Sequence, residues 1–521
     1  MPSRCRRPSQ RLAVPIMFVA TFFLVVMDGA ITTVALPSIA HQFHMSATDI
    51  DGVVVVYPVC VGLIIPVSGW LGDRFGDKPV LLSAMTLFTL SSALCGMAGS
   101  LGELVLFRGL QGLSGGLLTP IVGAMLFRTF TPDERVRASR IMTLPQQIAP
   151  AVAPMLGGYL VDGFSWRWVF YVNLPFGAAA VLFGLLALDT VRQPRVGRFD
   201  LPGFLLSAAA MSLLMYGMSE GAQQGWTAPS ILGSLVLGSV LLAATIVVGL
   251  RTAEPILRLR LFGNRLFRDM NLINLIGLVP FMAAMYLAPL FLQEAQGVSA
   301  LVSGASTFPE AIGVLLTVQL VSRVYERVGP RRIIAAGLFC VAAVLGVMTT
   351  CDLHTGPWTF RTYMFLLGVG MGAVFMPTTV ASFSTVRQSD IGQASTLGSV
   401  VRQISMAMAP ALAATLLVAN SGGGEGSQVA SKPPVSAYQT VYLVMAVIAL
   451  ASALFTLTVR DGTGRLRRRG RPGPAAVDGA AGDGAVVDGA AVDGALLEQA
   501  AAGPELPCSA GAEPPVDRRD G

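Results

Sequence analysis

The sequence contains fourteen long apolar runs. A membrane-spanning helix needs about 20 mostly apolar residues. Backbone polar groups in hydrocarbon must be satisfied within their own segment, which a helix achieves, whereas barrel strands would be about half as long. The sequence therefore predicts an all-α integral membrane protein with 14 transmembrane spans. The runs lie near residues 14–36, 52–71, 79–98, 103–127, 141–161, 168–188, 201–219, 230–250, 270–292, 303–322, 333–350, 358–383, 396–419 and 438–459.

The composition excludes most soluble classes. Charged residues make up 13% of the 521 residues and apolar residues 53%, whereas a soluble globular chain carries about 25% charged residues. This polar surface is too small for a soluble enzyme, and the composition does not fit a disordered scaffold or a disulfide-rich secreted domain. The six cysteines and three histidines form no cluster with metal-ligand spacing. We therefore expect no disulfide framework, no metal and no cofactor.

The basic residues predict the orientation in the membrane. With the N-terminus placed in the cytoplasm, the predicted outer loops hold Arg167, Arg361 and Lys432, and most of the 36 Lys and Arg residues fall on the opposite side. This asymmetry is the positive-inside signal. The net charge of +6 then comes from basic loops that face anionic lipid, and it does not indicate nucleic-acid binding. We expect a multi-pass monomer in the bacterial inner (cytoplasmic) membrane with both termini cytoplasmic.

Two segments of the chain recur at a nearly constant offset. GWLGDRFGDK (69–78) matches SRVYERVGPR (322–331) at an offset of 322 − 69 = 253 residues, and QIAPAVAPML (147–156) matches QISMAMAPAL (403–412) at an offset of 403 − 147 = 256 residues. The repeat predicts two six-helix bundles related by a pseudo-twofold axis, with two further helices inserted between them.

This repeat divides the chain into five predicted segments. The segments are a basic cytoplasmic N-terminus (1–13), an N-terminal six-helix bundle (14–188), inserted spans 7 and 8 with their loops (189–269), a C-terminal six-helix bundle (270–459) and a disordered cytoplasmic tail (460–521). The tail has VDGA-like repeats around Asp478, Asp488 and Asp493. They favour a solvated low-complexity segment over a calcium site.

Several motifs carry a family resemblance. GWLGDRFGDK resembles the loop signature of the major facilitator superfamily, and LFRGLQGLSGG (106–116) and APAVAPMLGGYL (149–160) resemble the helix-four and helix-five motifs of its drug:proton antiporters. MDGAITTVALP (27–37), WRWVFYVNLPFG (166–177) and FDLPGFLL (199–206) are similar to the fourteen-span, EmrB/QacA-type branch. The resemblance covers about 460 residues and implies a proton-coupled exporter.

Asp28 is the clearest candidate for proton coupling. It lies about 14 residues into the first apolar run, roughly 21 Å along a helix, and a charge at the bilayer centre costs about 2.5–3.5 kcal/mol. Hydrocarbon favours the neutral carboxyl, so Asp28 could take up a proton from one side and release it to the other, or release it when a cationic substrate arrives. The alternative is a structural carboxylate held by hydroxyls such as Thr32 or Thr33.

Three further ionisable residues lie in predicted spans. Arg108 stays charged at any working pH and needs an acidic or carbonyl partner; the resemblance implies a role in proton transfer, and the alternative is a structural pair. Glu310 is predicted either to attract cations or bind a second proton, or to face a wet outer vestibule. Glu220 is expected at the interface, and Arg402 near the cytoplasmic edge, where it would extend to the membrane surface.

Several small residues, one proline and one cytoplasmic loop are candidates for a role in the conformational change. Gly112, Gly157 and Gly158 allow close helix packing, and Pro154 bends its helix, with ordinary membrane packing as the alternative. In the first cytoplasmic loop, the resemblance implies that Asp73, with Arg74 and Gly76, latches the cytoplasmic side, where Asp73 would meet the N-terminus of the 396–419 helix. The alternative is a role in topology alone.

The sequence favours a transporter over an enzyme. It contains no GxxxxGK[ST] or HExxH motif, and its loops are too short for a catalytic domain. We predict proton-coupled efflux of amphipathic, cationic drugs or antibiotics by alternating access. The alternative is a facilitator-type exporter or importer of a specific metabolite or peptide, since the fold does not set the direction of transport.

Overall fold

All regular structure in the described part of the chain is helical. The computed structural model describes residues 9–43, 51–131, 134–190, 197–420 and 433–459. The helices are α1 (Gln10–Phe43), α2 (Asp51–Phe75), α3 (Asp77–Met97), α4 (Leu101–Thr129), α5 (Arg135–Gly163), α6 (Trp168–Tyr171), α7 (Asn173–Ala187), α8 (Leu201–Gln224), α9 (Pro229–Arg251), η2 (Leu259–Gly263), α10 (Arg265–Leu290), η3 (Phe291–Ala295), α11 (Ala300–Thr307), α12 (Pro309–Val328), α13 (Pro330–Met348), α14 (Pro357–Ser384), η4 (Gln388–Asp390), α15 (Ile391–Ala419) and α16 (Val435–Thr458).

The all-α membrane fold predicted from the apolar runs is confirmed. Within the described residues, 13 helices are long and apolar enough to cross a membrane. The predicted span at 141–161 corresponds to α5, which has 29 residues but is not among the 13. Its first turns carry Arg135, Arg137 and Arg140, and it packs against α1, α12 and α14. Because α5 faces protein on several sides, it needs less apolar surface than a helix that faces lipid.

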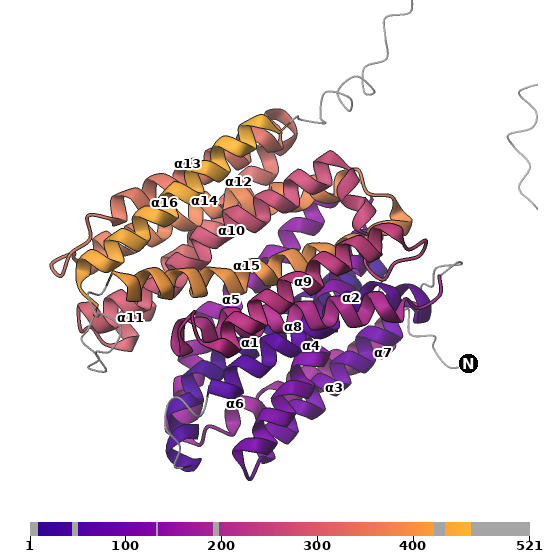
Figure 1. Cartoon of the computed structure of the whole chain (residues 1–521), viewed down its shortest axis with the longest axis horizontal. Helices are drawn as coiled ribbons and strands as arrows, with labels where there is room; N and C mark the ends of the chain where they lie inside the picture. The colour runs from indigo at the N-terminus through magenta and orange to yellow at the C-terminus, as the bar shows by residue number, and fades with distance from the viewer. Residues whose placement is uncertain (1–8, 44–50, 132–133, 191–196, 421–432, 460–521) are drawn as a thin grey trace, which may run out of the picture. The chain divides into compact units, whose positions relative to one another are not determined.

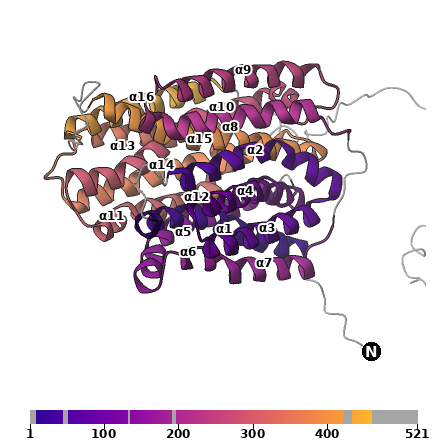
Figure 2. The ribbon, with the colours of Figure 1, turned by 60° about the horizontal axis from the view of Figure 1, so that its bottom comes forward.

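The helices gather into two groups with an inserted pair. Helices α1 to α7, the first half, pack mainly on one another, and helices α10 to α16, the second half, do likewise; Figure 1 shows the two groups in indigo to purple and in rose to yellow. The inserted helices α8 and α9 pack as a pair, and α8 also contacts α2 and α15. Figure 2 shows this pair on the side of the molecule where α2 and α15 run together.

The described residues lie in one compact unit, Met1–Arg465. The predicted five-segment division stays a prediction. Most of the basic N-terminal segment and the whole predicted tail, 460–521, lie outside the described residues.

The internal repeat is visible in backbone geometry. Gly76 and Gly329, which occupy matching positions of the repeat, have φ of 94° and 85°, a region that favours glycine. Each directly precedes a helix, α3 or α13. A Cβ on Gly112 of α4 would lie 2.6 Å from the Tyr57 carbonyl of α2, and one on Gly372 of α14 would lie 2.8 Å from the Val314 carbonyl of α12. Both halves therefore use a glycine to bring the corresponding helix pair into backbone contact.

The two predicted glycines of α5 differ in surroundings. A Cβ on Gly157 would lie 2.9 Å from Ile31 Cγ1 of α1, whereas a Cβ on Gly158 would meet no atom within 4 Å. Gly157 thus permits the close α1–α5 packing, and Gly158 is not required for it. The side chain of Pro154 lies outside the described part of the structure.

Candidate functional site

The Asp28 carboxylate lies inside the first half and is held by three donors. Arg108 Nη1 of α4 donates to Asp28 Oδ2 at 2.8 Å. Gln111 Nε2 of α4 and Asn173 Nδ2 of α7 donate to Asp28 Oδ1 at 2.7 and 2.8 Å. The side chains of Asp28 and Arg108 are 0% and 3% exposed. This arrangement satisfies an ionised carboxylate in an apolar environment.

A second layer of contacts fixes the donors. Arg108 Nη1 also donates to Gln111 Oε1 at 2.7 Å, and the Arg108 guanidinium lies 4.5 Å from the centre of the Tyr57 ring. Asn173 Nδ2 donates to Ser92 Oγ at 3.0 Å, and Ser92 Oγ donates to the Phe170 carbonyl at 2.9 Å. Helices α1, α2, α3, α4 and α7 therefore converge on one ion pair.

The structure identifies the partner of Arg108 and the groups that hold the Asp28 carboxylate, both of which the sequence left open. Arg108 needs an acidic or carbonyl partner, and that partner is Asp28. The hydroxyl alternative for Asp28 is wrong, because Thr32 Oγ1 donates to the backbone carbonyl of Asp28 and Thr33 Oγ1 to that of Ala30. The carboxylate is free of both hydroxyls and bound to α4 and α7.

Gln111 and Asn173 are functional candidates that sequence reasoning missed. Gln111 lies three residues after Arg108 and thus on the same face of α4. Asn173 is the first residue of α7 and is fully buried. A polar amide in an otherwise apolar run was the available signal for both.

The cluster has two chemically distinct states. With Asp28 ionised, the carboxylate compensates the Arg108 charge and accepts from both amides. Protonation of Asp28 would remove that compensation and turn one acceptor oxygen into a donor. Gain or loss of one proton therefore changes what holds α1, α4 and α7 together.

A cavity lies between the two halves and is separate from this cluster. It has a volume of about 100 Å³. Its lining comes from α4, α5, α10, α14 and α15 and comprises Thr119, Gly123, Phe127, Ser139, Met142, Thr143, Phe267, Asn271, Asn274, Leu278, Phe375, Thr379, Ser382, Phe383, Ala394, Ser395, Gly398, Ser399 and Arg402. Asp28 is not in this lining; the structure places it among the first-half helices, so direct contact with a ligand in the cavity is not its role in this conformation.

Arg402 does not extend to the membrane surface as predicted. Helix α15 begins at Ile391, five residues before the predicted run, so Arg402 lies 11 residues into it, roughly 16 Å along the axis. Its side chain lines the cavity, and its guanidinium lies 5.5 Å from the centre of the Phe22 ring of α1.

Glu310 is not brought near the Asp28 pair. It lies in the first turn of α12 and is 8% exposed, in a helix that packs mainly on α14. Its Oε1 has no hydrogen-bond partner among the described residues. A buried carboxyl with an unpartnered oxygen remains a candidate for proton binding. Glu220 accepts from Gln224 Nε2 at 2.7 Å.

One end of the bundle carries a network of charged groups. We call it the basic end; here α2 and α4 end and α15 begins, and it is the end predicted to be cytoplasmic. Arg128 of α4 donates to Asp73 Oδ1 of α2 and to Asp77 Oδ2 of α3, both at 2.6 Å. A Cβ on Gly392 of α15 would lie 3.0 Å from Asp73 Oδ1. The expected meeting of Asp73 with the α15 N-terminus is therefore seen, with Arg128 as the missed central residue.

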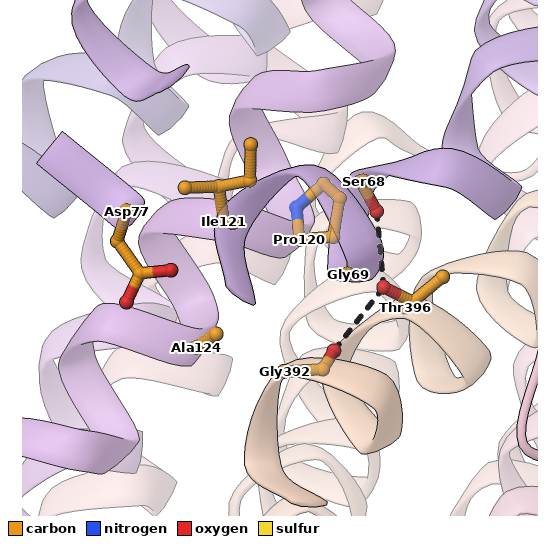
Figure 3. Close-up of a pocket in the computed structure, with 9 residues that line it drawn as sticks. Ser68, Gly69, Asp77, Pro120, Ile121, Ala124, Gly392 and Thr396 are labelled. Carbon is orange, nitrogen blue, oxygen red and sulfur yellow. Dashed lines mark hydrogen bonds between the residues drawn. The ribbon is translucent and has the colours of Figure 1, made fainter. Parts of the chain in front are cut away.

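Further polar contacts join the halves at the basic end. Ser68 Oγ and Thr396 Oγ1 are 3.0 Å apart, and Thr396 Oγ1 donates to the Gly392 carbonyl at 3.1 Å (Figure 3). The Ser395 hydroxyl donates to the Pro120 carbonyl at 2.8 Å. The Arg128 carbonyl accepts from Gln388 Nε2 at 2.9 Å.

Helix α5 extends this closure. Arg135 donates to the Phe383 carbonyl and Arg140 to Gln319 Oε1. The Phe127 and Phe383 rings stack with centres 4.2 Å apart. The molecule is therefore closed at the basic end. Arg74, predicted to act with Asp73, is exposed and takes no part in the hydrogen bonds found there.

Gly392→Ala is expected to open the basic end. The new Cβ would lie 2.6 Å from Arg128 Nη2 and 3.0 Å from Asp73 Oδ1. These two atoms are hydrogen-bonded to each other, so the Cβ can be accommodated only if the ion pair shifts. Overpacking of this kind costs about 1–3 kcal/mol, which corresponds to roughly a tenfold increase in the open population. The measurement is the rate at which a thiol reagent labels Ser395→Cys in a cysteine-free background. Gly398→Ala is the matched control, because its Cβ would meet only Asn271 Oδ1 at 3.8 Å. Equal labelling in both variants contradicts the assignment of Gly392 to the closure.

Comparisons with known proteins agree on one family. The model of the Major Facilitator Superfamily matches residues 18–410. The chain is 30% identical to the multidrug transporter protein MdtP of Bacillus subtilis over 81% of this chain and 78% of the relative. It is 30% identical to the putative multidrug resistance protein MdtD of Serratia proteamaculans over 86% of this chain and 95% of the relative. The crystal structure of the human organic anion transporter MFSD10 has the same fold, with a TM-score of 0.62 at 15% identity over 86% of this chain and 100% of that one.

Proposed function

This chain belongs to the Major Facilitator Superfamily, and we propose that it is a proton-coupled exporter of amphipathic small molecules that works by alternating access. Its relatives are named multidrug transporters, so the chain is a multidrug-type transporter rather than an enzyme. Proton coupling, the direction of transport and a bacterial inner-membrane location with cytoplasmic termini are parts of the proposal.

The observation that carries the proposal is the buried Asp28–Arg108 pair. Its two side chains are almost inaccessible and 2.8 Å apart. Water must reach Asp28 from one side at a time for a proton to be carried across. Each proton that moves down 100 mV releases about 2.3 kcal/mol, which is enough to favour one arrangement of the halves over the other.

The proposed cycle uses the ion pair and the contacts at the basic end. With Asp28 ionised and paired, the molecule is closed at the basic end. Proton uptake by Asp28 releases Arg108 and loosens α1 from α4 and α7, which lets the halves rock and the basic-end contacts of Arg128, Asp73 and α15 separate. A substrate then enters from the basic end, and proton loss to that side restores the ion pair and the closure.

The charge of the substrate is a separate part of the proposal. A preference for cationic drugs, as predicted from the sequence, finds support in Glu310, whose carboxyl has an oxygen with no hydrogen-bond partner among the residues that the structure describes. The described residues that line the cavity include no acidic side chain. The proposal that the chain exports small molecules therefore does not depend on whether those molecules are cationic.

Inverted membrane vesicles test the proposed function. Uptake of compounds from a drug panel is measured in vesicles that contain the protein and in vesicles that lack it, before and after the proton gradient is collapsed with an uncoupler. We expect uptake that depends on the protein and disappears with the gradient. Uptake that survives the collapse would contradict proton coupling and favour the facilitator-type alternative.

A further inference from the structure

The charge balance of the cavity differs from that of the ion-pair cluster. Among the described residues that line the cavity, Arg402 carries the one charged side chain. In the cluster, by contrast, the Arg108 charge is compensated by Asp28 at 2.8 Å. Among the described side chains, no carboxylate pairs with Arg402. The cavity therefore has a net positive charge that a ligand could neutralise.

No hydrogen bond joins the Arg402 guanidinium to a described residue. The guanidinium lies over the Phe22 ring, 5.5 Å from its centre, a cation–π contact that requires none of its N–H groups to donate a hydrogen bond. The N–H groups point along the edges of that plane and form a fork that matches a carboxylate in two parallel hydrogen bonds. Within the described part of the chain, a basic group thus faces a space between the halves, and its N–H groups donate to no protein acceptor there.

The remaining lining is amphipathic. Phe375, Leu278 and Met142 offer apolar surface, while Asn274 and Ser399 offer neutral hydrogen-bonding groups. The cavity volume of about 100 Å³ is below the ~300–1,000 Å³ of pockets that hold drug-sized ligands. A ligand of that size therefore requires the two halves to separate around it.

We propose that Arg402 is the substrate-recognition residue of this cavity and binds the carboxylate of an amphipathic organic acid or zwitterion. The apolar body of the ligand packs against the aromatic and aliphatic lining, and its carboxylate accepts two hydrogen bonds from the guanidinium. This inference rests on the proposed function for the transport of such a molecule, but it concerns binding alone. It assigns a substrate class opposite to the cationic one expected from the sequence.

Equilibrium binding of two matched dyes tests this proposal. The probes are rhodamine B, which carries a free carboxylate, and its ethyl ester, which has the same ring system without that carboxylate. Fluorescence polarisation is measured with the full-length protein in lipid nanodiscs. We expect the wild type to bind rhodamine B at least about tenfold more tightly than the ester, the effect of one charge-assisted contact.

Variants separate recognition from folding. Arg402→Gln should lose the preference, so that the two dyes bind with similar affinity, and Arg402→Lys should keep part of the preference. Arg361→Gln is the matched control, because Arg361 also lies over an aromatic ring, that of Trp358 at 4.7 Å, but does not line the cavity; it should behave as the wild type.

The outcomes are distinct from those of the vesicle experiment, since binding needs no proton gradient. Retention of the acid preference by Arg402→Gln, equal binding of the two dyes by the wild type, or binding of neither dye would overturn the proposal. Loss of gradient dependence in vesicles with an intact acid preference would overturn proton coupling and leave this inference standing.

Discussion

Cells that produce the Asp28→Asn variant are expected to be as sensitive to exported compounds as cells that lack the protein. Asparagine has nearly the shape of aspartate but cannot gain or lose a proton, so the cluster is left in a single state. Its amide also cannot compensate the Arg108 charge, which lies 2.8 Å from the carboxylate in the wild type. The measurement is the minimal inhibitory concentration across a drug panel, with membrane levels of the protein determined in parallel.

Glu220→Gln provides the matched control. Glu220 is also buried, at 7% exposure, and belongs to the inserted helix α8, but its carboxylate contacts Gln224 rather than an arginine. We expect this variant to protect cells as well as the wild type does. Equal protection by wild type and Asp28→Asn would remove the coupling role from Asp28.

The second large effect concerns stability and depends on both partners of the ion pair. Removing one partner of a buried pair leaves an uncompensated charge and costs about 3–5 kcal/mol. We therefore expect Asp28→Asn and Arg108→Gln each to destabilise the protein by that amount. The double variant removes both charges and should be much more stable than the sum of the single effects predicts, yet it should not export.

A double-mutant cycle measures this coupling. The free energy of unfolding is determined for the wild type, both single variants and the double variant in the same bilayer mimic, and export is assayed for all four. Additive single effects would mean that the pair contributes no interaction energy. Export by the double variant would mean that the pair serves the fold rather than proton coupling.

The sequence predicted the helices well because the membrane imposes a simple physical rule. Apolar runs of about 20 residues form helices wherever lipid is the solvent, and 13 helices of the described chain follow that rule. The weakest of the predicted spans, α5, is not among them and packs against helices of both halves. The glycine pair Gly76 and Gly329 could be found as a repeat, and the structure adds that both need a positive φ.

The sequence could not predict which side chains of different helices contact each other. Asp28 and Arg108 are 80 residues apart, and each was recognised by the cost of its own charge in hydrocarbon, but nothing in a single sequence says which helix faces which. For the same reason, the sequence did not indicate that Arg128 is the centre of the basic-end network or that Asn173 donates a hydrogen bond to Asp28. Arg402 was placed near the membrane surface because the start of α15 was set five residues too late.

Proton movement driven by substrate decides whether Asp28 couples export to protons. Proteoliposomes are loaded with a compound that the wild type exports and with a lumenal pH indicator, and are diluted into compound-free buffer without an imposed proton gradient. As substrate leaves, we expect protons to enter and acidify the lumen with the wild type, and we expect no substrate-driven acidification with Asp28→Asn. Acidification by Asp28→Asn at the wild-type rate would contradict proton coupling through Asp28.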